Sequence, residues 1–342
     1  MSEYLSIAVD AMGGDFGPRI TVPACINLLK HHSFIQLQLA GDLAELEPLL
    51  AHVPQSLRQR IHVHHTLSVV SMHDKPSHAL RHRRDSSMFK AVELVQQGVA
   101  AACVSAGNTG ALMALGCSLL GTLPGIDRPA IISAIPTQKG HCFLLDLGAN
   151  VNCTAEQLLQ FALMGSAMVS AVEDNPSPRI GLLNIGIEEI KGNDLVRQAA
   201  RLIQAHSGLN YIGYVEGGEV FSDRADVIVC DGFTGNIALK SNEGLARLIA
   251  EKLRKSFTRN LYRRLLGLLA QPVLKELQQQ IDPGRRNGAS LLGLQGVVVK
   301  SHGGAGQSHF EAALNQAVTD ACLNIPARIT AQLQQQLSGS GD

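Results

Sequence analysis

The segment ADVIVCDGFTGNIALKSNEGLARLIAEKL, residues 225–253, contains the pattern that indicates the fold class. Its apolar run, residues 225–229, has the length of a buried strand, and the residues after Ile237 have the apolar spacing of a helix. Between them, CDGFTGN holds two glycines and polar Asp, Thr and Asn residues. Such a turn at a helix N-terminus can bind an anion or a carbonyl oxygen. The alternative is a tight connection in which Gly232 and Gly235 only supply unusual backbone angles.

The same order of apolar run and glycine turn recurs along the chain. It is seen in AVDAMGGD from Ala8, FIQLQLAGD from Phe34, ACVSAGNTG from Ala102, FLLDLGANVN from Phe143 and IGLLNIGIEEIKG from Ile180. Short strands that alternate with helices predict an α/β protein of three layers, α/β/α, with a mostly parallel sheet. Ligands of such sheets bind at the carboxyl ends of the strands. We therefore expect these turns to converge on one pocket.

Length and composition bound the other possibilities. The chain has 342 residues, and its 29 Lys and Arg balance its 29 Asp and Glu, so no global charge favours nucleic acid as a partner. We expect one two-lobed α/β domain over residues 1–335, with a helical excursion at about 244–280 and a tail at 336–342. The Pro-rich stretch EDNPSPRI, residues 173–180, is a candidate junction between the lobes.

Cysteine usage and hydropathy indicate a cytoplasmic protein. The cysteines are scattered and form no CxxC pair, which is typical of free thiols in a reducing compartment; they are Cys25, Cys103, Cys117, Cys142, Cys153, Cys230 and Cys322. The N-terminus does not have the pattern of a signal peptide, and no apolar stretch has the length of a membrane span. His62, His64 and His65 alternate along one predicted strand without a carboxylate or cysteine at ligand spacing, so we assign no metal site.

Polar residues in the glycine turns are the candidates for binding an anion. Neither a GxGxxG nucleotide fingerprint after the first strand nor a Walker motif is present. A lysine beside a turn, as in NIGIEEIKGND at residues 184–194, can neutralise phosphate, and SAGNTG at residues 105–110 offers N–H donors at a helix start. The predicted substrate-binding and phosphate-binding residues are Gly13, Gly14, Asp15, Ser105, Gly107, Asn108, Thr109, Asn184, Glu188, Asp231, Thr234 and His302.

Six of these motifs together identify a family. AVDAMGGDFGP, ACVSAGNTGALM, LDLGANV, LLNIGIEEIKG, DVIVCDGFTGNIALK and LLGLQGVVVKSHG resemble, in order from Ala8 to Gly303, the signatures of the bacterial acyl-[acyl-carrier-protein]:phosphate acyltransferases, the PlsX family. Ile187 stands where members often carry an acidic or polar residue. The resemblance implies transfer of a fatty acyl group from acyl carrier protein to inorganic phosphate, which gives acyl phosphate for glycerophospholipid synthesis.

The resemblance also implies the fold, the catalytic residues and the partners. The fold is that of a homodimer similar to isocitrate and isopropylmalate dehydrogenases and to phosphotransacetylases, without cofactor or metal. The catalytic residues that match the family motifs are Lys191 and Asn236. We assign Lys191 to the phosphate and Asn236 to the thioester oxygen. A membrane glycerol-3-phosphate acyltransferase is the implied consumer of the product.

Two other functions remain open at this point. One is an NAD-dependent decarboxylating dehydrogenase on the related fold, which requires a nucleotide loop and a carboxylate cluster for a metal. The other is a non-catalytic, membrane-associated scaffold for lipid-synthesis enzymes.

The helical excursion is a candidate membrane surface. It contains no acid between Glu251 and Glu276, and its basic residues are Lys252, Arg254, Lys255, Arg259, Arg263 and Arg264. On a helix its apolar residues gather on one side; these are Phe257, Leu261, Leu265, Leu268 and Leu269. Such a helix either lies on an anionic membrane, which makes the protein peripherally membrane-associated, or packs on its own domain or across a dimer interface.

Overall fold

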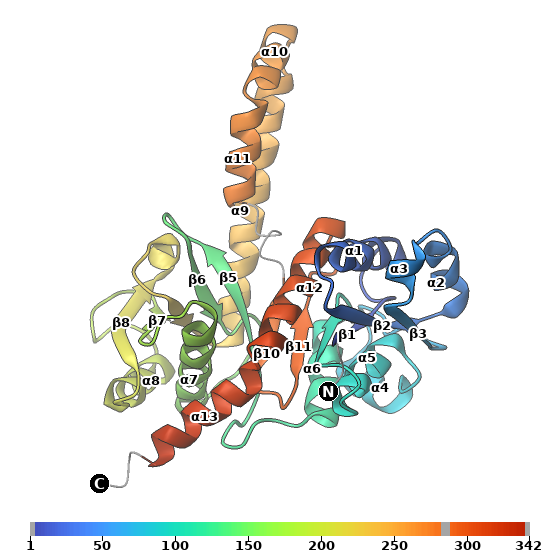
Figure 1. The fold of residues 1–342 in the computed structure, drawn as a ribbon. Coiled ribbons are helices and arrows are strands. Elements are labelled where there is room, and N and C mark those ends of the chain that lie inside the picture. The colour runs from blue at the N-terminus through green and yellow to red at the C-terminus, as the bar shows by residue number, and fades with distance from the viewer. Residues whose placement is uncertain (1–3, 282–287, 339–342) are drawn as a thin grey trace.

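The computed structural model describes residues 4–281 and 288–338 and is built around one eleven-stranded sheet (Figure 1). The strands are β1 (Leu5–Asp10), β2 (Ile35–Gly41), β3 (Ile61–His65), β4 (Ala102–Ser105), β5 (Ala130–Pro136), β6 (His141–Leu145), β7 (Arg179–Asn184), β8 (Asn210–Glu216), β9 (Val227–Val229), β10 (Ala289–Leu292) and β11 (Val297–Lys300). Their order across the sheet is β3-β2-β1-β4-β11-β10-β5-β6-β9-β7-β8.

Strand direction reverses at the centre of this sheet. Seven neighbouring pairs are parallel, so the predicted mostly parallel sheet is confirmed. The antiparallel pairs are β11 with β10, β10 with β5, and β5 with β6. After three reversals, β6, β9, β7 and β8 run opposite to β11, β4, β1, β2 and β3. We call the edge at which β1, β4 and β11 end the first edge, and the edge at which β6, β9 and β7 end the second edge.

Helices alternate with most of the strands along the chain. They are α1 (Pro18–His31), α2 (Leu43–Leu50), α3 (Gln55–Arg58), α4 (Pro76–His82), α5 (Ser87–Gln96), α6 (Thr109–Leu119), α7 (Ala155–Val172), α8 (Asp194–Ala205), the 3-10 helix η1 (Gly217–Phe221), α9 (Gly232–Thr258), α10 (Leu261–Leu269), α11 (Gln271–Ile281), α12 (Gln307–Cys322) and α13 (Ile325–Ser338).

The sheet is covered by helices on both faces. In β9, Val227 and Val229 belong to a core cluster with Phe161 of α7, while Ile228 belongs to another with Leu239 of α9. Alternate residues of a strand point to opposite faces, so these two clusters lie on opposite sides of the sheet. One face carries α1, α2 and α12 together with α7, α8 and α13, and the other carries α4, α5, α6 and α9. The predicted three-layer α/β/α architecture is confirmed.

Two details differ from the sequence predictions. The Pro-rich residues 173–180 connect α7 to β7, which share one core cluster, so this stretch does not separate two lobes. At the C-terminus, α13 continues to Ser338, so the helix includes the first residues of the predicted tail. Residues 339–342 of that tail lie outside the described residues.

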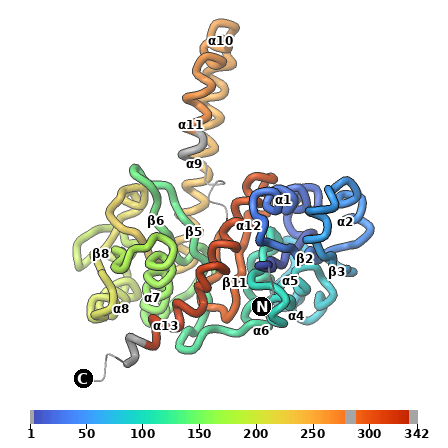
Figure 2. Tube along the Cα trace, viewed as in Figure 1, coloured from blue at the N-terminus to red at the C-terminus, as the bar shows by residue number. Residues whose placement is uncertain are grey.

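The helical excursion consists of three helices. In Figures 1 and 2, α9 leaves the body, α10 forms the far tip and α11 turns back. Asn260 starts α10 because its side-chain oxygen accepts a hydrogen bond from the Arg263 N–H at 2.9 Å. The apolar residues that the sequence analysis placed on one helix are therefore divided between α9 and α10. Phe257 packs against Gly267, while Leu265 and Leu269 are exposed, so Phe257 does not share their surface.

Candidate active site

The predicted site residues fall into two groups because the strands reverse. Gly13, Gly14 and Asp15 follow β1, residues 105–109 end β4 and begin α6, and His302 follows β11, all at the first edge. Asn184 to Lys191 follow β7, and residues 231–236 follow β9, at the second edge. The turns therefore lie at two opposite edges of the sheet.

A buried carboxylate organises the first edge. Ser105 Oγ donates to Asp10 Oδ2 at 2.7 Å, and the Gly107 N–H donates to Ser105 Oγ at 3.0 Å. Burial raises the pKa of Asp10, and the hydrogen bond from the Ser105 hydroxyl opposes that rise. The donors that the sequence assigned to phosphate here therefore stabilise an internal carboxylate.

Asn108 and the glycine turns hold the first edge together. The Asn108 side chain accepts from the Ala111 N–H at 3.0 Å, which caps α6, and donates to the carbonyl oxygen of Met72 at 2.9 Å. The Asp15 N–H donates to the Gly303 carbonyl at 2.9 Å. A Cβ on Gly14 would stand 2.9 Å from that same oxygen, so only glycine allows this approach. The amide of Asn108 is thus used within the protein.

Lys300 is a first-edge residue that the sequence analysis did not select. It is buried at the end of β11, and its Nζ donates to the carbonyl oxygens of Ala106 at 3.3 Å and of Ser301. Burial lowers the pKa of Lys300 to about 8, against the attraction of Asp10. A charged residue that ends the apolar run VVVK was the available signal.

The other first-edge candidates are more accessible. His302 is exposed, and its Nδ1 accepts from the Gly304 N–H at 3.1 Å. Partial desolvation of the imidazole ring by the surrounding protein, followed by the charge of Lys240 on α9, lowers the pKa of His302. Thr109 is half-buried as the first residue of α6. Lys240 belongs to α9, whose first residues lie at the second edge.

A second buried carboxylate organises the second edge. Asp146, directly after β6, accepts N–H groups of Ile131 at 3.0 Å, Ala149 at 3.0 Å and Asn150 at 2.7 Å. Burial raises its pKa, and these bonds oppose that rise. The backbone donors of the LDLGAN turn are therefore occupied by the turn's own carboxylate.

The CDGFTGN segment is the start of α9. Asp231 is the N-cap, and it accepts from the Thr234 N–H at 2.8 Å and the Thr234 hydroxyl at 2.7 Å. Gly232 and Gly235 are helical, so they do not supply the unusual backbone angles of the alternative interpretation. A Cβ on Gly235 would stand 1.9 Å from the Asp146 carbonyl oxygen. Both glycines let α9 lie directly on the loop after β6.

This close packing places Asn236 on the surface of the second edge. Asn236 is exposed in the second turn of α9 and lies beside Gly148, whose added Cβ would stand 3.4 Å from the Asn236 Cβ. Lys191 is also exposed. Neither side chain forms a hydrogen bond or ion pair with the rest of the described chain, residues 4–281 and 288–338. These two differ in this respect from Ser105, Asn108, Asp231 and Thr234.

The loop after β7 carries Lys191 at the second edge. Asn184 Nδ2 donates to the Lys191 carbonyl at 3.2 Å, and the Lys191 N–H donates to the Glu188 carbonyl at 3.0 Å, so the loop closes on itself. In the sheet register Leu182 pairs with Val229. Asn184 ends β7, and Asp231, the cap of the helix that carries Asn236, stands two residues after the end of β9. Adjacent strands thus supply the two predicted catalytic residues.

Comparison with known proteins gives the family. The family model described as "Fatty acid synthesis protein" matches residues 5–328. Proteins named phosphate acyltransferase are 55% identical over 328 residues in Pseudomonas syringae pv. syringae, and 51% over 334 residues in Shewanella sediminis. These alignments cover 96% and 97% of this chain, and 96% and 98% of the relatives. The chain belongs to the phosphate acyltransferase family.

Solved structures confirm the fold expected for a phosphate acyltransferase. A phosphotransacetylase from Streptococcus pyogenes has a TM-score of 0.62 at 17% identity and covers 94% of this chain and 95% of its own. A 4-hydroxythreonine-4-phosphate dehydrogenase from Klebsiella pneumoniae has a TM-score of 0.53 at 15% identity and covers 94% and 100%. At such identities the likeness concerns the fold alone. It supports the predicted dehydrogenase-like class for this acyltransferase.

In this phosphate acyltransferase, His64 and His65 form hydrogen bonds within the protein, and the cysteines are free thiols. His64 Nε2 lies 2.7 Å from Gln38 Oε1, and His65 Nδ1 accepts from the Leu43 N–H. Within residues 4–281 and 288–338, no three His, Cys, Asp or Glu side chains are grouped as metal ligands. All seven cysteines are free thiols, and Cys25, Cys103, Cys142 and Cys230 are buried. No helix in the described chain is long and apolar enough to cross a membrane.

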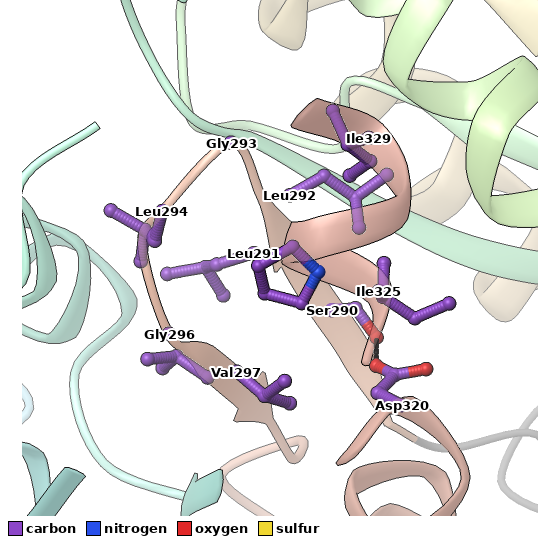
Figure 3. A pocket seen from close by; sticks show the side chains of 12 residues that line it. Ser290, Leu291, Leu292, Gly293, Leu294, Gly296, Val297, Asp320, Ile325 and Ile329 are labelled. Carbon is purple, nitrogen blue, oxygen red and sulfur yellow. Dashed lines mark hydrogen bonds between the residues drawn. The ribbon is translucent and has the colours of Figure 1, made fainter. Parts of the chain in front are cut away.

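A small pocket in this phosphate acyltransferase lies between the sheet and the C-terminal helices. It is lined by β10, the turn before β11, and the junction of α12 with α13 (Figure 3). Asp320 is its buried acid and accepts from Ser290 Oγ at 2.5 Å and Gln316 Nε2 at 2.8 Å. Burial raises the pKa of Asp320 to about 6. None of the predicted site residues lines this pocket.

Proposed function

We propose that this enzyme transfers a fatty acyl group from the thioester of acyl carrier protein to inorganic phosphate. The product is acyl phosphate, which a membrane glycerol-3-phosphate acyltransferase consumes in glycerophospholipid synthesis. Support comes from the names of the relatives and from the fatty acid synthesis description of the family. The observation that carries the assignment of the site is that Lys191 and Asn236 are both exposed at the second edge and that neither side chain has a hydrogen-bond or ion-pair partner among the described residues.

The proposed chemistry needs charge stabilisation more than a protein nucleophile. A phosphate oxygen attacks the thioester carbonyl carbon, the carbon–oxygen bond forms, and the carbonyl oxygen becomes an oxyanion. The carbon–sulfur bond then breaks, and the leaving thiolate takes a proton from water. Lys191 offsets the charge of phosphate, and the Asn236 amide donates to the oxyanion. The N-terminal end of α9 adds a favourable dipole near that oxygen.

A turnover assay separates this proposal from the alternatives. Palmitoyl thioester of acyl carrier protein is mixed with the enzyme, with and without phosphate, and acyl phosphate is measured. The proposal requires product formation that depends on phosphate and needs neither nicotinamide nor added metal. Reduction of NAD by a hydroxy acid would favour the dehydrogenase. Absence of any turnover by folded protein would favour the scaffold.

We also propose that the excursion gives the enzyme its partner surfaces. Leu245, Leu248, Ile249 and Leu253 recur on α9 at helical spacing, and each is at least 36% exposed. A homodimer that buries this stripe is the expected state, and light scattering tests it.

At the tip, exposed leucines of α10 stand beside Arg263 and Arg264, which suits peripheral attachment to an anionic membrane from the cytoplasm.

A further inference from the structure

The geometry points to an acyl-chain surface at the second edge, and this inference rests on the proposed function. Lys191 and Asn236 are accompanied by large apolar side chains that are at least half exposed; they are Val151, Ile185, Ile187, Ile190, Phe233 and Ile237. We propose that the fatty acyl chain of the thioester lies across these side chains while its carbonyl group meets Asn236. The site residues predicted from the sequence concern catalysis and phosphate binding, and none was assigned to the fatty acyl chain.

Three adjacent strands deliver this surface. Ile185, Ile187 and Ile190 are in the loop after β7, and Phe233 and Ile237 are in the first turns of α9 after β9. Val151 follows Asn150, whose carbonyl oxygen accepts the Gly232 N–H at 2.8 Å, so the loop after β6 joins the same surface. Neighbouring strands are about 4.8 Å apart, so three strand ends span roughly 10 Å.

The apolar side chains are interleaved with the catalytic candidates. Ile190 directly precedes Lys191, and Ile237 directly follows Asn236. Ile185 and Ile190 are 82% and 81% exposed, which is costly for isoleucine in water unless a partner covers it. A substrate whose reactive carbonyl must sit at Asn236 extends its apolar chain from that point. A linear acyl chain therefore fits this surface better than a polar ligand does.

The first edge supplies a matched comparison. Leu67, in the loop after β3, is 80% exposed, much like Ile185. Its backbone N–H donates to the Asp85 carbonyl oxygen at 3.2 Å, and the first edge, unlike the second, uses the polar atoms of Ser105 and Asn108 internally. If the chain lay at the first edge instead, Leu67 would be the sensitive residue.

The test compares donors of different chain length. Values of kcat/KM are measured with palmitoyl and octanoyl thioesters of acyl carrier protein for the wild type, for Ile185→Asn with Ile190→Asn, and for Leu67→Asn. Each methylene removed from water contributes about fourfold in affinity. We expect the palmitoyl-to-octanoyl ratio to fall at least about tenfold in the double variant, because several methylenes lose apolar contact. The ratio should be unchanged in Leu67→Asn.

Other outcomes overturn the inference in distinguishable ways. An unchanged ratio in the double variant excludes the surface, and a fall in Leu67→Asn moves the chain to the first edge. Equal loss with both donors, together with dissociation in light scattering, means that a second copy covers the isoleucines. Calorimetric binding of palmitate to the wild type, lost in the double variant, provides a readout without turnover. If the wild type turns over neither donor, the proposed function itself fails.

Discussion

Asn236 is the residue on which the proposed chemistry depends most. Its amide is exposed at the start of α9 and is not engaged by other described side chains. One oxyanion donor contributes about 100- to 1000-fold in rate. We therefore expect Asn236→Ala to lower kcat by that factor with little effect on the phosphate KM. Steady-state assay at saturating phosphate measures this, and near-normal turnover by the folded variant contradicts the assignment.

Lys191 should act on phosphate instead. Replacing it by Ala removes a positive charge from the loop after β7, whose closure depends on backbone groups and Asn184, so the loop should persist. We expect the phosphate KM to rise by about tenfold or more, since a hydrogen bond to a charged group contributes about 1.5–3 kcal/mol. Lys139→Ala, a change in the β5–β6 connection, is the control. Equal effects of Lys191→Ala and Asn236→Ala on the phosphate KM would refute the division of roles.

At the scale of the element, α9 owes its position to Gly232 and Gly235, which pack on the loop after β6. A Cβ on Gly235 would meet the Asp146 carbonyl oxygen at 1.9 Å, whereas one on Gly244 of the same helix would meet nothing within 4 Å. Gly235→Ala should therefore destabilise the protein by about 3 kcal/mol or more. Gly244→Ala should stabilise it by about 0.5–1 kcal/mol, because alanine favours the helix. Urea unfolding measures both, and similar effects of the two variants would contradict this account.

The strands and helices were easier to predict from the sequence than the tertiary contacts between them. The apolar run and glycines of residues 225–236 indicated strand and helix correctly, because both signals are local. The hydrogen bond from Ser105 to Asp10 and the close packing of Gly235 on Asp146 join segments that are distant in the chain. Local sequence patterns therefore do not reveal them. The separation of the turns into two edges depends on β10 and β5, whose antiparallel pairing no local pattern shows.

At the scale of the whole molecule, α12 and α13 connect two core clusters that lie on the same face of the sheet. They belong to different core clusters, and Asp320 near the end of α12 bonds to β10 between them. The pKa of Asp320 is raised to about 6 by burial, so between pH 4 and 6 the folded state keeps a proton that the unfolded state has lost. Its contribution to stability is therefore present below pH 4 and is lost as pH rises through 6.

Asp320→Asn should remove this pH dependence. The variant should equal the wild type in stability near pH 4 and exceed it at pH 7 by at most about 3 kcal/mol. Urea unfolding at several pH values measures the difference between the two curves, which cancels the contributions of Asp10 and Asp146. Parallel curves would show that Asp320 does not titrate in this range.

Membrane attachment is a prediction about the molecule as a whole, since α10 lies at the end of the excursion farthest from the sheet (Figure 1). Leu265 and Leu269 are 57% and 72% exposed there, and each nearby Lys or Arg contributes about 1 kcal/mol at an anionic surface. We expect the protein to sediment with anionic liposomes at low salt, and Leu265→Glu with Leu269→Glu to abolish this.

The double variant should keep its activity in a soluble assay, because α10 is remote from Lys191 and Asn236. Leu43→Glu with Leu67→Glu, two exposed leucines of the body, is the control and should still sediment. If the wild type stays in the supernatant, or if the α10 variant loses its oligomeric state along with its folding, the leucines of α10 belong to a protein interface. Sedimentation that survives in the α10 variant would instead place the membrane contact elsewhere on the molecule.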